Sequence, residues 1–365
     1  MKIIISGGGT GGHIFPAIAI ANAIKAKYPN ADILFVGANG RMEMEKVPAA
    51  GYRIEGLDIA GIQRTLTLRN ILKNLMLPFK ILKSNRRAKQ IIQQFNPDVV
   101  IGVGGYASFP TLNMASKLKI PCLIQEQNSY PGVVNKRLKN KVQKICIAYD
   151  DVRKYFPSEK IVFTGNPIRQ DISDLNHKRD EAAIYFNVDS TKKTLLVIGG
   201  SLGARTINES LLAMLPELAQ TDLQVIWQTG KNFDISAVDT QKHPNIHIMP
   251  FITRMDLAYS IADFIVSRAG ALSISELCMV GKPAILIPSP NVSEDHQTKN
   301  AMALVNQNAA LFVADKDAKT ALFSTISDLL NNAELQVNLS QNISKLAKTD
   351  AAKQIADIVD SIKKS

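Results

Sequence analysis

Three glycines and a histidine near the amino end have the types and spacing that chemistry requires. Gly7, Gly9 and Gly12 follow a short apolar run, and His13 comes directly after them, in the expected first turn of a helix. A glycine turn at a helix start exposes backbone N–H groups that can hold an anion or a sugar hydroxyl. The helix dipole lowers the pKa of a histidine placed there, which leaves a neutral imidazole able to accept a proton. The segment therefore indicates an anion site with a general base.

The same glycines also match G-x-G-x-x-G, the pattern of dinucleotide-binding folds. Such folds need an acid at the end of the second strand to hold the ribose hydroxyls. Here that expected strand ends in Gly37-Ala38-Asn39-Gly40, and Glu43 comes late. The missing acid argues against NAD or FAD. A purely structural role stays open, in which the glycines only let the helix pack closely on the strand.

The elements that would position these residues occur twice along the chain. Strand 2–5 leads into the turn 7–12 and a helix from Ile14 to about Lys27, and strand 192–198 leads into the turn 199–203 and a helix from about Ala204 to Ala219. Further strands are expected at 31–37, 98–104, 223–230, 245–251 and 262–268. This alternation predicts an α/β fold with two Rossmann-like, doubly wound domains. A site shared by both would lie in a cleft at the carboxyl ends of their strands.

Length and charge agree with two domains. A chain of 365 residues suits residues 1–165 and 166–340, followed by a carboxyl-terminal helix in 341–365 that packs back towards the first domain. Of the net charge of +11, residues 1–170 hold 25 Lys and Arg against 10 Asp and Glu. A basic half can face nucleic acid, anionic lipid or a phosphorylated substrate.

One segment carries much of this basic charge. Between Asp58 and Asp98 there are eight basic residues and no acid. The residues expected at a lipid surface are Arg69, Lys73, Leu75, Leu77, Phe79, Lys80 and Lys83. Basic and apolar residues mixed in this way suit anionic membrane lipid, although a core helix with a solvated basic face fits as well. No motif of a nucleic-acid binder is present, and no uncharged apolar run approaches the roughly 18 residues that span a bilayer.

Eight motifs, in order through most of the chain, are similar to those of the MurG family of undecaprenyl-diphospho-muramoylpentapeptide β-N-acetylglucosaminyltransferases. They are GGGTGGHIFPA (7–17), GVGGYASFP (102–110), QEQNSYPG (125–132), GNPIR (165–169), GGSLGA (199–204), PFITRMDLAYSIAD (250–263), SRAGALSISE (267–276) and EDHQTKNA (294–301). The resemblance implies the GT-B glycosyltransferase fold, with the donor UDP-N-acetylglucosamine in the second domain and a place at the cytoplasmic face of the plasma membrane.

The resemblance also implies roles for individual residues. The donor would contact Thr10, Gly11, Gly12, Asn128, Arg169, Ser201, Ile252, Ala271, Leu272, Ser273, Glu276 and Gln297. The helix start at 271–273 suits a diphosphate, and Glu276 suits the ribose hydroxyls. Some relatives carry Gln-Gln where this chain has His296-Gln297, so the resemblance assigns His296 no role.

On the acceptor side, the glycine turn with His13 and the residues Gly104, Gly105 and Tyr106 would hold the diphosphate and muramoyl sugar of the undecaprenyl-diphosphate-linked muramoyl-pentapeptide. The implied reaction is an inverting transfer to the muramoyl 4-hydroxyl, with His13 as the base. No tightly bound cofactor and no protein metal site are expected, and a divalent cation could still assist. Asp315-Lys316-Asp317 has the spacing of a metal-binding D-x-D but is expected in a solvated turn far from the donor motifs.

Two other enzyme classes and one non-enzyme share features of the chain. A UDP-sugar epimerase of the same build would use the donor motifs without a lipid face. A glycolipid synthase, such as a diacylglycerol galactosyltransferase, has similar glycine turns and a membrane face. A non-catalytic membrane adaptor would need no donor pocket.

Overall fold

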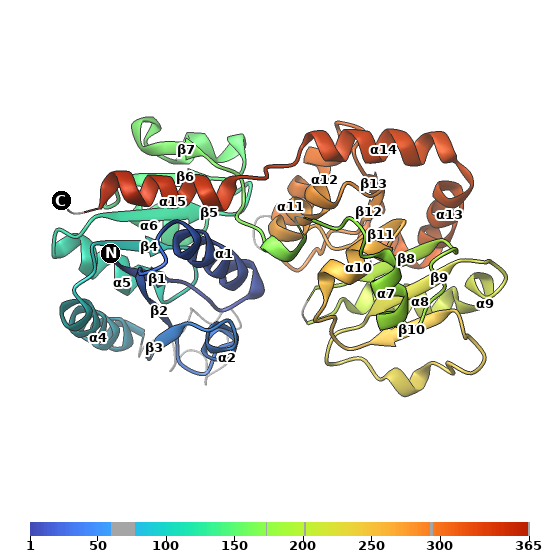
Figure 1. Ribbon diagram of the computed structural model, residues 1–365, viewed down its shortest axis with the longest axis horizontal. Coiled ribbons are helices and arrows are strands. Elements are labelled where there is room, and N and C mark those ends of the chain that lie inside the picture. Colours follow the sequence, from blue (N-terminus) through green and yellow to red (C-terminus); the bar gives the residue numbers. More distant parts are fainter. Residues whose placement is uncertain (60–76, 173, 201, 293–294, 364–365) are drawn as a thin grey trace. The chain divides into compact units, whose positions relative to one another are not determined.

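The structure is a computed structural model and describes residues 1–59, 77–172, 174–200, 202–292 and 295–363 (Figure 1). The chain divides into two compact units, one formed by Met1–Arg169 with Asp350–Ser365 and the other by Gln170–Thr349. The chain therefore returns to the first unit at Asp350 rather than at 341. The reason is that helix α14 (Ala333–Lys345) buries Leu339 in the core of the second unit, so the return starts only after this helix has ended.

The first unit is built on a parallel sheet with the strand order β3-β2-β1-β4-β5-β6-β7. Its strands are β1 (Lys2–Ser6), β2 (Asp32–Ala38), β3 (Arg53–Leu57), β4 (Val99–Gly102), β5 (Cys122–Glu126), β6 (Lys144–Ile147) and β7 (Ile161–Phe163). Successive side chains of a strand point to opposite faces. Because both faces of β1 are covered, its sequence is a continuous β-branched run rather than an alternating one.

Helices cover both faces of this sheet (Figure 1). They are α1 (Gly11–Lys27), α2 (Glu43–Ala49), α4 (Leu77–Phe95), α5 (Ser108–Lys117), α6 (Val133–Leu138) and α15 (Ala351–Ile362). On one face, Ile5 of β1 belongs to a core with Ile20 of α1 and Val359 of α15. On the other face, Ile4 belongs to a core with Ile91 of α4 and Leu112 of α5. The carboxyl-terminal helix α15 is therefore part of the first unit's core.

The second unit repeats this plan with the parallel strand order β10-β9-β8-β11-β12-β13. Its strands are β8 (Thr194–Ile198), β9 (Gln224–Gln228), β10 (Ile246–Met249), β11 (Phe264–Ser267), β12 (Ala284–Leu286) and β13 (Leu311–Phe312). Its helices are α7 (Arg179–Phe186), α8 (Arg205–Ala213), α9 (Leu215–Leu218), α10 (Met255–Ile261), α11 (Ala271–Val280), α12 (His296–Val305), α13 (Ala318–Asn331) and α14.

One expected helix of the second unit is divided in two. The sequence predicts a single helix over 204–219, but α8 ends at Ala213 and α9 begins at Leu215. Pro216 lies in the first turn of α9, where its missing N–H costs nothing, whereas inside a continuous helix it would remove a hydrogen bond and clash with the preceding turn. The prediction of one helix was wrong because it disregarded this proline.

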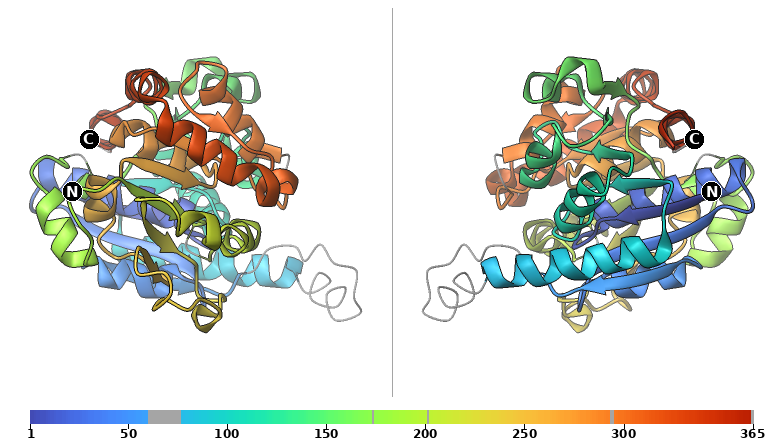
Figure 2. Two further views of the ribbon diagram at one scale, coloured as in Figure 1. Left: turned by 90° about the vertical axis from the view of Figure 1, so that its right-hand side faces the viewer. Right: turned by 90° about the vertical axis from the view of Figure 1, so that its left-hand side faces the viewer.

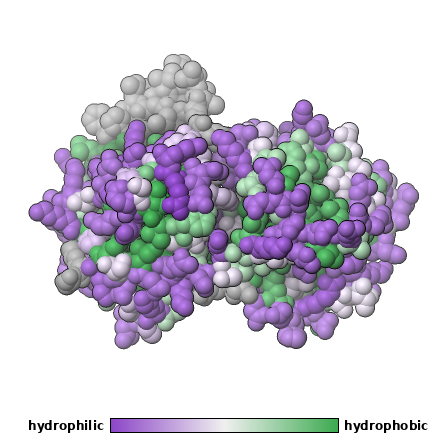
Figure 3. Space-filling view, turned by 90° about the horizontal axis from the view of Figure 1, so that it is seen from above, coloured by the Kyte–Doolittle hydropathy of each residue, from purple (hydrophilic) through white to green (hydrophobic). Residues whose placement is uncertain are grey.

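The face of the molecule seen in Figure 3 is mostly hydrophilic. The face in Figure 3 carries smaller hydrophobic areas among polar and charged residues. Cys122, Cys146 and Cys278 are buried and free, and burial raises the pKa of each thiol to about 12. In the described ranges, no helix is long and apolar enough to cross a membrane.

Candidate active site

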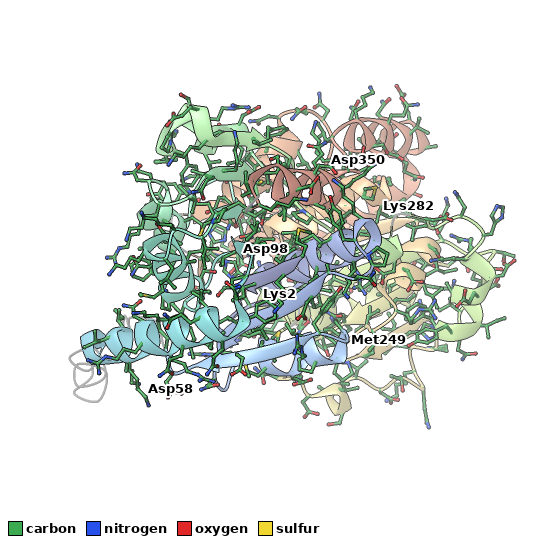
Figure 4. The ribbon with its side chains drawn as sticks, turned by 60° about the vertical axis from the view of Figure 1, so that its left-hand side comes forward. Lys2, Asp58, Asp98, Met249, Lys282 and Asp350 are labelled. Carbon is green, nitrogen blue, oxygen red and sulfur yellow. The ribbon has the colours of Figure 1, made fainter. Side chains whose placement is uncertain are left out.

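The glycine motifs lie where ligands usually bind to doubly wound sheets. In each sheet the strand order reverses between two neighbours, β1 and β4 in the first unit and β8 and β11 in the second. The general binding position is beyond the carboxyl ends of the strands at this reversal. The turns 7–12 and 102–106 follow β1 and β4, and the turns 199–203 and 268–270 follow β8 and β11. At the opposite ends of these strands, their amino ends, the backbone N–H of Lys2 donates to Asp98 at 2.7 Å (Figure 4).

The two glycine turns of the first unit pack directly on each other. Gly8 and Gly9 have φ of 144° and 89°, and Gly104 and Gly105 have φ of 91° and 84°, a region that other residues rarely adopt. A Cβ on Gly105 would come within 2.3 Å of the carbonyl oxygen of Gly8. Backbone conformation therefore favours glycine at all four positions, and the close approach of the two turns also requires it at Gly105.

The imidazole of His13 lies over the second of these turns. A Cβ on Gly104 would be 2.7 Å from its Cδ2 and 2.8 Å from its Nε2. On the other side of the ring, Nδ1 lies 3.1 Å from the carbonyl oxygen of Gly8 and 3.3 Å from Oγ1 of Thr10. A carbonyl can only accept, so Nδ1 carries the proton in this hydrogen bond and Nε2 keeps its lone pair. The ring can thus accept a proton at Nε2.

The protonation of His13 is governed by its surroundings. Burial lowers the pKa of its imidazole, while the hydrogen bond to Gly8 and the negative charge of Glu43 act in the opposite direction. The direction is the one that the sequence predicts. The main cause of the lowered pKa, however, is burial, whereas the prediction from the sequence rested on the helix dipole alone.

Glu43 is a site residue that was not predicted from the sequence. Glu43 is the first residue of α2 and is buried, with 1% of its surface exposed. One carboxylate oxygen accepts from the N–H of Gly9 at 2.7 Å and the other from the N–H of Ala38 at 3.0 Å. A pyrophosphate on this turn would compete for the same N–H and meet a like charge, which adds to the argument against a dinucleotide.

A second buried carboxylate organises the loop after β5. Glu126 accepts hydrogen bonds from the N–H groups of Asn128 and Gly132 and from the side chain of Asn135, at 3.1, 3.0 and 2.9 Å. Burial raises the pKa of this carboxyl, and the hydrogen bonds act against it. Asn128, expected at the donor sugar, is thereby held in place at the end of β5.

The same loop fastens the segment that carries Arg169. Asn166 accepts from Gln125 and donates to the carbonyl oxygen of Gln127, both at 3.0 Å. Gln127 in turn donates to the carbonyl oxygen of Val103 at 2.8 Å, which ties the loop to the turn beside His13. Arg169 is therefore the last residue of the first unit and follows a segment fixed to its site. Tyr106, expected at the acceptor, follows Gly105 and is 44% exposed.

In the second unit, one missed residue joins two expected donor loops. Gln228, at the end of β9, accepts from the N–H of Ile252 at 2.9 Å and donates to the carbonyl oxygen of Gly200 at 3.1 Å. The N–H of Ile252 is thus occupied by Gln228. The backbone group of Ile252 that can still hydrogen-bond to a nucleobase is its carbonyl oxygen. Ser201 lies outside the described residues.

The motif SRAGALSISE forms a strand end, a turn and a helix start, as its sequence predicts. Helix α11 begins at Ala271, so Ala271, Leu272 and Ser273 make up its first turn. Gly270 precedes it and has no side chain that could cap the N–H groups of this turn. Glu276, in the second turn, accepts a hydrogen bond from the hydroxyl of the buried Tyr259 at 2.9 Å.

Gln297 and His296 both lie in the first turn of α12. Gln297, in the first turn of α12, accepts from the N–H of Ser289 at 2.8 Å, which leaves its NH₂ group as the donor end. His296 precedes it as the first residue of α12 and is partly exposed.

The expectation for Asp315 was wrong. Asp315 does not lie in a solvated turn far from the donor motifs. It lies against Arg268, the residue that follows β11, and forms an ion pair with it. It also accepts from the hydroxyl of Thr206 at 3.0 Å, while Arg268 donates to the carbonyl oxygens of Ile287 and Pro288. A chain separation of 47 residues hid this contact from the sequence analysis. Among the residues that the structure describes, no group of acids, histidines and cysteines could hold a metal ion.

Only part of the expected lipid-binding segment is described. Arg69, Lys73 and Leu75 lie outside the described residues, and so do the side chains of Leu77 and Phe79. Figure 2 shows α4 beside β3. Its inner face packs on the sheet through Ala88, Ile91 and Ile92.

The outer face of α4 is basic. Lys80 is partly buried, and Lys83 is exposed and pairs with Asp58 at 3.0 Å. Leu82 beside it is 52% exposed. The described side chains of α4, from Lys80 onward, therefore fit the alternative of a core helix with a basic outer face, and Leu82 is exposed on that face.

Comparisons with known proteins agree over the whole chain. Residues 3–147 match the glycosyltransferase family 28 N-terminal domain, and residues 194–355 match the glycosyltransferase family 28 C-terminal domain. The chain is 53% identical over 362 residues to a UDP-N-acetylglucosamine--N-acetylmuramyl-(pentapeptide) pyrophosphoryl-undecaprenol N-acetylglucosamine transferase of Parabacteroides distasonis, with 98% of this chain and 96% of the relative covered. It is 54% identical over 360 residues to the transferase of the same description from Phocaeicola vulgatus, with 98% and 95% covered.

Solved structures are similar in fold. MurG of Acinetobacter baumannii matches with a TM-score of 0.76 and 29% identity over 99% of each chain. A UDP-GlcNAc 2-epimerase from Neisseria meningitidis bound to UDP-GlcNAc matches with a TM-score of 0.68 and 16% identity, over 99% of this chain and 100% of the other, and shares the fold alone. The expected two-domain GT-B glycosyltransferase fold is confirmed. The chain therefore belongs to the family of UDP-N-acetylglucosamine--N-acetylmuramyl-(pentapeptide) pyrophosphoryl-undecaprenol N-acetylglucosamine transferases.

Proposed function

We propose that the chain transfers N-acetylglucosamine from UDP-N-acetylglucosamine to the 4-hydroxyl of the muramoyl sugar in undecaprenyl-diphosphate-linked muramoyl-pentapeptide, in the synthesis of peptidoglycan. The observation that carries this proposal is the match at 53% identity over 98% of the chain to a transferase named for these two substrates. The epimerase alternative has only the shared fold at 16% identity in its support.

For the reaction, we assign the proton transfer to His13. The muramoyl 4-hydroxyl attacks the anomeric carbon, a new C–O bond forms, and the bond from that carbon to the diphosphate oxygen breaks, which inverts the configuration. The hydroxyl proton passes to Nε2 of His13, because Nδ1 is engaged by Gly8. The proposed acceptor contacts are Gly104, which lies against this ring, and Gly105 and Tyr106, which follow Gly104 in the chain.

For the donor, the proposed contacts follow from the groups that each loop presents. The start of α11 at 271–273 and Ser201 suit the diphosphate, and the carboxylate of Glu276 suits the ribose hydroxyls. The carbonyl oxygen of Ile252 suits the N3–H of uracil, because a carbonyl only accepts.

Further donor contacts are proposed for Arg169, Asn128 and Gln297, and for the turn with Thr10, Gly11 and Gly12. We propose no tightly bound cofactor or protein-held metal, and a divalent cation could accompany the diphosphate.

For localisation, we propose peripheral attachment to the cytoplasmic face of the plasma membrane through the basic segment that includes α4. Lys83, Arg86 and Lys89 are exposed on its described part, and Leu82 is 52% exposed among them. Each basic residue near an anionic membrane contributes about 1 kcal/mol.

The transfer is tested by incubating the protein with labelled UDP-N-acetylglucosamine and the undecaprenyl-linked muramoyl-pentapeptide, and by detecting a labelled disaccharide lipid. Diacylglycerol in place of the acceptor tests for a glycolipid synthase, and incubation without an acceptor tests for an epimerase. Label in diacylglycerol alone, or an isomerised UDP-sugar alone, would overturn the proposal.

A further inference from the structure

The carboxylate of Glu43 joins two strand ends of the first unit. It lies at the start of α2, and its two oxygens accept from the N–H of Gly9 in the turn after β1 and from the N–H of Ala38 at the end of β2. Both bonds are charge-assisted, which makes them stronger than neutral ones, and the side chain of Glu43 that accepts them is buried. The carboxylate therefore fixes the glycine turn relative to the sheet.

Gly8 lies between this carboxylate and the ring of His13. A Cβ on Gly8 would come 2.2 Å from the carboxyl carbon of Glu43, and one on Gly37 would come 2.6 Å from its Cγ, so glycines line the side chain closely. On its other side, the carbonyl oxygen of Gly8 is bound by Nδ1 of His13. A shift of the carboxylate would therefore move the peptide that orients the imidazole.

Glu43 also acts on His13 through its charge. Among the described residues packed around the ring, Glu43 is the ionisable group whose charge favours the protonated imidazole. The field acts across the Gly8 peptide, without direct contact. A base that takes up a proton becomes a cation, and a fixed anion nearby stabilises that cation.

We propose that Glu43 is a positioning residue for the transfer, which holds the 7–12 turn so that His13 presents Nε2 above Gly104, and whose negative charge stabilises the imidazolium formed when His13 takes the proton. Both parts rest on the proposed function, in which His13 is the base. The action of the charge on the ring can be measured without turnover, by titration, whereas the positioning role is measured by kcat, so the two are tested by different measurements.

The test uses Glu43→Gln in the full chain, with Glu45→Gln as its matched control. A glutamine has the same shape, but its NH₂ group cannot accept from a backbone N–H, so one of the two bonds and the charge are lost. Glu45 lies on the same helix, with 72% of its side chain exposed, and pairs with Lys46. We expect kcat to fall about tenfold or more in Glu43→Gln, with the KM for UDP-N-acetylglucosamine within about twofold. Glu45→Gln should match the wild type.

The second measurement follows His13 directly, by NMR titration of ¹⁵N-labelled histidines, with His13→Gln to assign the signal among the five. Wild-type His13 should carry its neutral proton on Nδ1. Its pKa should be lower in Glu43→Gln than in the wild type, because the anion that favours imidazolium is gone. Glu43→Asp keeps the charge, but the side chain is one methylene shorter. In this variant the pKa of His13 should stay close to the wild-type value, while kcat should fall in part.

These outcomes separate the two claims. An unchanged His13 pKa in folded Glu43→Gln overturns the action of the charge, whatever the activity. Wild-type kcat in Glu43→Gln overturns the positioning role. Wild-type kcat in His13→Ala would overturn the proposed base, yet the titration would still decide whether Glu43 acts on the ring. If Glu43→Gln does not fold, Glu43→Asp decides, because wild-type kcat in that variant contradicts the positioning role.

Discussion

Nδ1 of His13 lies 3.1 Å from the carbonyl oxygen of Gly8, so the backbone of the glycine turn selects the tautomer of the histidine beside it. The lone pair is left on Nε2, over Gly104. The proposed base is therefore oriented by a backbone carbonyl rather than by a carboxylate in direct contact with the ring. The oriented ring has consequences that kinetics can measure.

The first prediction concerns the base. His13→Ala should lower kcat by about 10²-fold or more with nearly unchanged donor binding, the usual loss for a general base. His177→Asn is the control, since His177 is exposed at φ 60° and asparagine tolerates that conformation. Steady-state kinetics with both substrates would test it. A loss confined to the acceptor KM would make His13 a binding residue.

The second prediction concerns pH. Burial lowers the pKa of His13, and the neutral ring is the active form, so kcat/KM should rise with pH and level off. The midpoint should lie below about 6.5, the ordinary value for histidine. A pH profile of the wild type, with stability checked at each pH, would measure it. A midpoint well above that value would contradict the lowered pKa of the partly buried ring.

The third prediction compares two glycines with the same backbone demand. Gly104→Ala and Gly40→Ala both place alanine at positive φ, 91° and 68°, at a cost of about 1–2 kcal/mol each. Only at Gly104 would the new Cβ meet the His13 ring, since nothing lies within 4 Å at Gly40. Gly104→Ala should therefore lose about tenfold or more in kcat, and Gly40→Ala little. Equal losses in both would mean that strain, not the ring, decides.

The fourth prediction concerns the donor. Glu276→Ala should raise the KM for UDP-N-acetylglucosamine or abolish turnover without unfolding the protein. Tyr259→Phe removes the hydrogen bond that holds this carboxylate, worth about 1 kcal/mol, and should raise the same KM by about fivefold. Glu217→Ala, at an exposed position of α9, is the control. Wild-type donor kinetics in a folded Glu276→Ala would remove Glu276 from the site.

The fifth prediction concerns the lipid surface. Reversal of Arg69, Lys73, Lys80 and Lys83 to glutamate should weaken binding to anionic vesicles by several kcal/mol at most, and binding of the wild type should fall with salt. Turnover of a water-soluble acceptor should survive. Cosedimentation with vesicles measures the first effect, and Lys117→Glu with Lys353→Glu, exposed elsewhere on the first unit, is the control. Equal binding to neutral vesicles would mean that apolar contact dominates.

The sequence by itself was enough for features that depend on neighbouring residues. The strand–glycine-turn–helix units at 2–27 and 192–213, the start of α11 after Gly270, and the position of His13 in the first turns of α1 follow from local backbone preferences. Pro216 shows the limit even here, because a single proline divided an expected helix.

Only the tertiary structure decided which distant residues meet. Glu43 lies 34 residues from Gly9, Gln228 lies 24 from Ile252, and Asp315 lies 47 from Arg268, yet each pair is joined by a hydrogen bond or ion pair. Each partner stands at the end of, or shortly after, a different strand, and strand order brings those ends to one edge of a sheet. Sheet order and register arise from the packing of whole faces, so no local pattern encodes these contacts.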